Sequence, residues 1–159
     1  MKTAITNLAR KLESVYNGQP WYGESLLQKL ERVSPAEAFA VPVPGVHNIA
    51  QIVAHLTGWR RVLSERLKGN MEYQLDVDSD ADWAPVSALQ QKGWSTILTE
   101  LAENQRELLA LLSAGTDELL DRVYSGTRTY RSFIEGIIQH DIYHTGQIGL
   151  LMSANKNAA

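Results

Sequence analysis

With 159 residues, the chain is long enough to bury one hydrophobic core and short for two, so we expect a single domain over residues 1–154 and a frayed tail at residues 155–159. The net charge of -3 comes from 15 basic and 18 acidic residues interleaved along the chain, which argues against a nucleic-acid groove or a polybasic membrane patch. The sequence has no cysteine, which excludes disulfides, thiolate metal sites and cysteine nucleophiles.

Four long stretches carry the apolar period of helices, and no strand alternation competes with them. The first covers residues 5–15 and ends at Gly18, and a shorter helix follows over residues 26–33. Residues 34–37, Ser-Pro-Ala-Glu, have the form of a capping box that opens a brief helix. Residues 41–45 must be extended, because their two prolines remove backbone donors and restrict the residues before them.

The second long helix begins at Asn48, which can cap it while Gln51 completes the reciprocal bond, and its apolar stripe ends near Gly69. An acidic loop follows over residues 76–82. Its neighbour Trp83 is large and apolar for a loop residue, so we expect this ring to pack back onto the fold.

The third long helix is predicted as one element from Pro85 to Gly115. Residues 124–131 predict a turn or hairpin-like lead-in, and the last helix runs from there to about Met152. Together the four amphipathic stretches predict an all-α four-helix bundle with short additional helices. Some of its connections are long enough to cross an end of the bundle, so not every neighbouring pair of helices need be antiparallel.

The last helix carries two histidines, His140 and His144, inside an apolar stripe. At about 100° per residue their rings point within about 40° of each other. Burying one such ring without a partner costs on the order of 1–3 kcal/mol, and a divalent metal ion would satisfy both rings at once. The alternative is a pair hydrogen-bonded to water and neighbouring side chains.

A third histidine, His55, lies in the second long helix with Trp59 one turn further on. A bundle can bring this ring to the pair, and three imidazoles from two helices leave the open positions of a catalytic metal site. Taken alone, His55 is better explained as a packed, hydrogen-bonded residue. We expect His47, in the loop before the helix, to be solvated rather than a ligand.

Other metal and nucleophile patterns fit less well. His140-Asp141-x-x-His144 is similar to the zinc-protease pattern H-E-x-x-H, but no His, Asp or Glu follows His144 to supply a third ligand. The sequence also lacks the Glu-x-x-His pairs of a di-iron bundle, a nucleophile elbow and a glycine-rich phosphate loop.

A helical His55 followed by Trp59, together with H-D-x-Y-H-T-G-Q-I at residues 140–148, resembles the DinB/YfiT-like superfamily over nearly the whole chain, through Leu151. The resemblance implies a bacterial up-down-down-up bundle over residues 1–154, frequently a homodimer. It implies a divalent ion, zinc or nickel with iron as a further candidate, held by His55, His140 and His144. Superfamily members with known activities include transferases for low-molecular-weight thiols and a mycothiol-dependent isomerase.

Several polar and aromatic residues are candidates for supporting roles. Asp141, Gln51 and Gln147 could hold the free N–H of an imidazole, or be solvated surface residues. Tyr143 could donate a proton, although a packed ring is the preferred interpretation. Four aromatic residues could line a substrate cleft or form the edge of the core: Trp21, Tyr22, Trp59 and Trp83.

A divalent ion on three neutral imidazoles would lower the pKa of bound water from about 15.7 towards about 7, and would acidify a thiol similarly. Together with the open three-histidine site, the resemblance implies a metal-dependent enzyme that transfers a small thiol to an electrophilic substrate. Hydrolysis of a small ester or amide and a non-enzymatic metal- or ligand-binding bundle are the alternatives. With no signal-peptide pattern and no long apolar run, we expect a cytoplasmic protein with a small-molecule substrate and neither nucleic acid nor membrane as partner.

Overall fold

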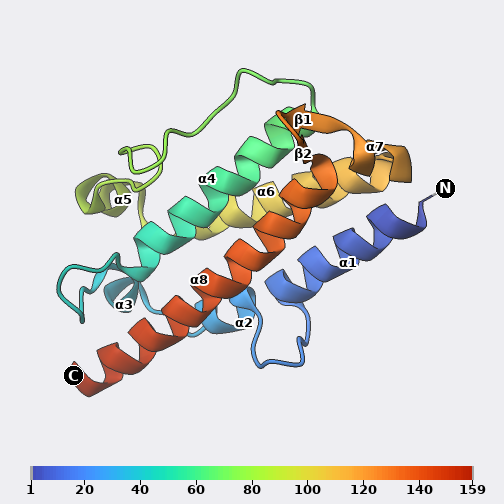
Figure 1. The fold of residues 1–159 in the computed structure, drawn as a ribbon. Coiled ribbons are helices and arrows are strands. Elements are labelled where there is room, and N and C mark those ends of the chain that lie inside the picture. Colours follow the sequence, from blue (N-terminus) through green and yellow to red (C-terminus); the bar gives the residue numbers. More distant parts are fainter. Residues whose placement is uncertain (1, 159) are drawn as a thin grey trace.

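The computed structural model describes residues 2–158, and helices form most of it (Figure 1). Its four long helices are α1 (Thr3–Asn17), α4 (Ile49–Leu67), α6 (Trp94–Ala114) and α8 (Tyr130–Ala158). Four short helices lie in the connections: α2 (Leu26–Leu30), α3 (Pro35–Phe39), α5 (Val86–Lys92) and α7 (Asp117–Asp121). Within the described range, no helix combines the length and the apolar character that crossing a membrane requires.

The long helices pack side by side around a shared interior. Helices α1 and α4 each contact both α6 and α8, and α8 crosses the front of the molecule between them (Figure 1). Two apolar clusters fill the interior: one contains Leu56 and Leu101, and the other contains Leu12 and Leu108. Each such side chain is almost fully buried, which stabilises the fold by about 1.5–3 kcal/mol per residue before entropy is counted.

Helix α4 begins where the sequence predicted. The backbone N–H of Gln51 donates to Asn48 Oδ1 at 2.9 Å, and the backbone N–H of Asn48 donates to Gln51 Oε1 at 3.2 Å. This capping box satisfies backbone donors that the first turn of a helix leaves free. The predicted hairpin is confirmed as well, since β1 (Val123–Ser125) pairs antiparallel with β2 (Arg128–Thr129) immediately before α8.

The short helix predicted over residues 26–33 ends at Leu30, and two other helix boundaries differ more from the prediction. The element predicted from Pro85 to Gly115 is two helices, α5 and α6, because Gly93 has φ +84° and ψ 146°, outside the helical region. Helix α8 continues to Ala158, beyond the predicted end near Met152 and through most of the predicted frayed tail. The Asn155 side chain donates to the Glu37 carbonyl at 3.2 Å and so ties this last part to α3. Residue 159 lies outside the described range.

Candidate metal centre

Helices α4 and α8 bring the three predicted histidines together. The Nε2 atoms of His55 and His140 are 2.9 Å apart, and those of His140 and His144 are 3.1 Å apart. One ring nitrogen from each of the three residues lies within 4.8 Å of the other two. His55 and His144 are buried and His140 is half-buried. Three converging nitrogen donors at this spacing could bind a divalent metal ion.

Two of these rings present a lone pair to the centre of the cluster. Nδ1 of His55 lies 2.7 Å from Oδ1 of Asp82, and a carboxylate can only accept, so this nitrogen carries the proton. Nδ1 of His144 donates to Gln147 Oε1 at 2.6 Å, while the Gln147 amide nitrogen donates to Tyr143 OH at 3.0 Å. With Nδ1 protonated, Nε2 of each neutral ring is free to bind a metal ion.

Burial keeps all three imidazoles in their neutral form, with one N–H each, at neutral pH. Desolvation lowers the pKa of His55, and the Asp82 carboxylate opposes this only in part, so their contact joins a neutral ring to a carboxylate. Desolvation, reinforced by the neighbouring rings of His144 and His55, lowers the pKa of His140 to about 3. Desolvation also lowers the pKa of His144. Metal ligation requires neutral imidazole, so the cluster is in the correct protonation state.

Asp82 contacts the histidine cluster, and the sequence interpretation missed it by treating residues 76–82 only as an acidic loop. It is 3% exposed, and besides His55 it accepts from Trp59 Nε1 at 2.9 Å and from the Asp78 amide at 3.0 Å. A carboxylate buried this deeply orients both the histidine and its own loop. Its position next to Trp83, which was expected to pack inward, was the one available signal.

Trp83 packs back onto the fold, as predicted. Its ring stacks on His55 at 3.9 Å between centroids, and His47 stacks on the opposite face at 3.7 Å. His47 is exposed, as predicted for a solvated loop residue, but it also forms the outer layer of this stack.

Of the three predicted supporting residues, Gln147 alone is hydrogen-bonded to an imidazole of the cluster. Asp141 binds Arg60 instead, with its two carboxylate oxygens 3.2 Å from Nε and 2.6 Å from Nη2, and both side chains are fully buried. Gln51 completes the α4 capping box and donates to the Ala84 carbonyl at 3.1 Å. Tyr143 is 62% exposed, so the interpretation as a packed ring is wrong.

Two cavities border the histidine cluster. The hairpin cavity, about 650 Å³, lies beside the β1–β2 hairpin and the first turns of α8, and His55 and His140 line it. The α8 cavity, about 590 Å³, lies between the later turns of α8 and the loop of residues 43–47, and His144 lines it. Both volumes lie in the range of small-molecule sites.

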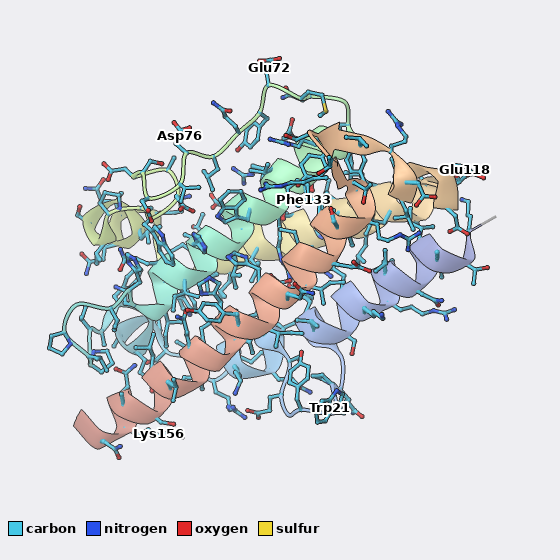
Figure 2. All side chains as sticks on the ribbon, viewed as in Figure 1. Trp21, Glu72, Asp76, Glu118, Phe133 and Lys156 are labelled. Atoms are coloured by element: carbon cyan, nitrogen blue, oxygen red, sulfur yellow. The ribbon has the colours of Figure 1, made fainter. Side chains whose placement is uncertain are left out.

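The four aromatic residues considered for a substrate cleft divide into two pairs. Trp59 lines the hairpin cavity, and Trp83 lines both cavities. Trp21 and Tyr22 line neither of them. Trp21 is 96% exposed and projects from the loop between α1 and α2 at the edge of the molecule (Figure 2).

Fold and cluster therefore define a helical protein with a buried group of three histidines that could hold a divalent metal beside small-molecule cavities. The family model of the DinB superfamily matches residues 23–148. The chain belongs to the DinB superfamily, as its histidine pattern predicted. No curated protein and no solved structure matches it.

Proposed function

We propose that this protein is a metal-dependent enzyme in which His55, His140 and His144 hold a zinc or nickel ion through Nε2, with iron as a further candidate. We propose further that it transfers a low-molecular-weight thiol to an electrophilic substrate. The observation that carries the proposal is the convergence of three neutral imidazole nitrogens, two of them on buried rings and one on a half-buried ring, directly beside two cavities. A metal ion bound by three imidazole nitrogens keeps coordination positions for exchangeable ligands.

The donor set fits such an ion. Imidazole nitrogen suits zinc, nickel and iron, and three neutral rings leave the positive charge of a divalent ion uncompensated. A bound ion would supply Lewis acidity, which lowers the pKa of a thiol or a water molecule. The protein's own residues fix the geometry: Asp82 and Gln147 orient two of the rings, and Trp83 covers His55.

In the proposed reaction the thiol sulfur forms a bond to an electrophilic carbon. The leaving group departs with its bonding electron pair, and the thiol proton passes to solvent. The cavities provide room for both reactants next to the histidines, and this counts against a bundle whose ion serves only to stabilise the fold.

The test compares zinc- or nickel-loaded protein with its His144→Ala variant. Each is incubated with glutathione or cysteine and 1-chloro-2,4-dinitrobenzene, and thioether formation is followed by absorbance. The loaded wild-type protein is expected to exceed both the variant and the metal-free protein, because the variant lacks one of three ligands. Equal rates in all three samples would refute the proposal. Turnover of a 4-nitrophenyl ester without any thiol would indicate hydrolysis instead.

Metal binding is measured separately from turnover. His47→Ala is the matched control for this measurement, since it removes an imidazole that stacks on Trp83 but is not one of the three clustered ligands. We expect it to retain one ion per chain, whereas His144→Ala loses it.

Three further features belong to the proposal. We propose the up-down-down-up helix order of the DinB/YfiT-like bundles, a homodimer as the working form, and the cytoplasm of a bacterium as its location. The acidic net charge of -3 supports a small molecule, rather than nucleic acid, as the partner.

A further inference from the structure

Trp83 lies where the two cavities meet the histidine cluster. Among the described residues it is the one that lines both of them. Its ring is held between His47 and His55 in a nearly parallel stack, with interplanar angles of 3° and 7°. The histidine cluster can therefore be reached from two sides, past His55 and His140 on one and past His144 on the other.

The walls of the two cavities differ in charge. Asp78, Asp82 and Arg128 line the hairpin cavity. The described wall of the α8 cavity contains no Asp, Glu, Lys or Arg. Aliphatic side chains make up much of that wall: Val43, Val46, Ile52, Leu150 and Leu151. A charged ligand entering there would lose water without gaining a charged side chain of the wall as its partner.

One polar side chain of the α8 cavity, Gln147, is already engaged. The side-chain oxygen of Gln147 accepts from His144, and its side-chain nitrogen donates to the Tyr143 hydroxyl. Both ends of this amide are therefore already hydrogen-bonded before a ligand binds. In addition, apolar side chains remain in water at the mouth of the cavity, with Leu150 74% exposed and Val46 46% exposed. Covering them with an apolar molecule would release water at a favourable free energy.

We propose that the α8 cavity binds an uncharged, apolar reactant, such as one carrying an aryl ring or a short alkyl chain, and presents it to the cluster from the His144 side. This inference rests on the proposed function, because it assigns one substrate of the same metal site. The more polar reactant would then bind in the hairpin cavity, whose wall contains charged side chains.

The test uses 2-naphthylmethanol as a neutral probe and isothermal titration calorimetry on the full chain, with and without zinc. Val46→Glu places a carboxylate in the α8 cavity, and Leu150→Glu does the same from α8. Val77→Glu is the matched control, because Val77 is an exposed valine that lines the hairpin cavity. All three residues are exposed, so the folded structure should tolerate the changes.

Both α8-cavity variants are expected to weaken probe binding at least tenfold, and Val77→Glu should change it less than twofold. Displacement of the probe by 2-naphthoate should need at least tenfold more ligand than displacement by 2-methylnaphthalene. The inference is overturned if Val77→Glu weakens binding as much as Val46→Glu, or if the two competitors act equally.

Zinc binding is titrated on the same samples without the probe. Intact zinc binding with no probe binding would overturn this inference alone. Probe binding that keeps the expected variant pattern while zinc fails to bind would overturn the proposed function, and would leave the cavity assignment supported.

Discussion

Replacing Asp82 by Asn tests whether the loop between α4 and α5 controls the metal centre. The carboxylate accepts three hydrogen bonds: Oδ1 receives Nδ1 of His55 and Nε1 of Trp59, and Oδ2 receives the Asp78 amide. An amide of the same shape has one acceptor and one donor end. Whichever way it is oriented, an NH₂ group then faces another N–H, so at least one of these bonds is lost together with the charge.

We expect Asp82→Asn to reduce zinc affinity about 10- to 100-fold, which is the usual effect of removing the partner of a metal-bound histidine. This corresponds to about 1.4–2.7 kcal/mol of binding free energy. The loss should not be total, because the backbone carbonyl of residue 82 also lies 3.2 Å from Nδ1 of His55. The free energy of unfolding of the metal-free protein should fall by about 1–3 kcal/mol, since a buried donor is left without a partner.

Zinc affinity is measured by competition with a chromophoric chelator, and stability by urea denaturation of the metal-free protein. Asp80→Asn is the matched control: it makes the same charge change in the same loop at an exposed side chain. If Asp82→Asn binds zinc within twofold of Asp80→Asn, then Asp82 does not orient His55 for the metal, and the assignment is wrong.

Three further predictions concern protonation, the buried ion pair and the helix break. Burial lowers the pKa of His140 to about 3, so between about pH 3 and 6.5 this side chain binds a proton in the unfolded chain but not in the folded metal-free protein. The urea midpoint should therefore fall as the pH drops through this window, and it should fall less in His140→Gln. Arg60→Met should lower the free energy of unfolding, measured by urea denaturation, by about 3–5 kcal/mol, because it leaves the buried Asp141 carboxylate unpaired. Adding Asp141→Leu should recover most of this loss. A double variant in which the losses of the two single variants add up would contradict the prediction. Gly93→Ala should lower the free energy of unfolding by about 1–2 kcal/mol because φ is +84° there, and an unchanged urea midpoint would show that the break between α5 and α6 is not held by this residue.

The sequence predicted most of the helices because their signals are local. The apolar period and the Asn48–Gln51 capping box lie within one element, and the structure has α4 beginning at Ile49. The split at Gly93 was missed because the apolar period continues on both sides, and only a backbone angle separates α5 from α6. A glycine in a helical pattern permits such a break without requiring it.

The candidate site was predictable as far as residue type and spacing reach. His140 and His144 share one face of a helix, so their proximity follows from the period alone. Asp82 contacts His55 across a loop, and Asp141 contacts Arg60 on another helix. Such contacts depend on how distant segments pack, and no periodic pattern in either segment encodes them.

The three rings of the cluster are not held equally, and this asymmetry bears on how the site would work. Asp82 fixes His55 and Gln147 fixes His144, each through Nδ1. Within residues 2–158 no hydrogen bond holds Nδ1 of His140, and this ring is the half-buried one that faces the hairpin cavity. Two rigid donors define where an ion would sit, and the third can turn to complete its coordination. The adaptable ring of His140 therefore lines the cavity with the charged wall, together with the fixed ring of His55, and a polar reactant would exchange there. The fixed ring of His144 faces the apolar cavity.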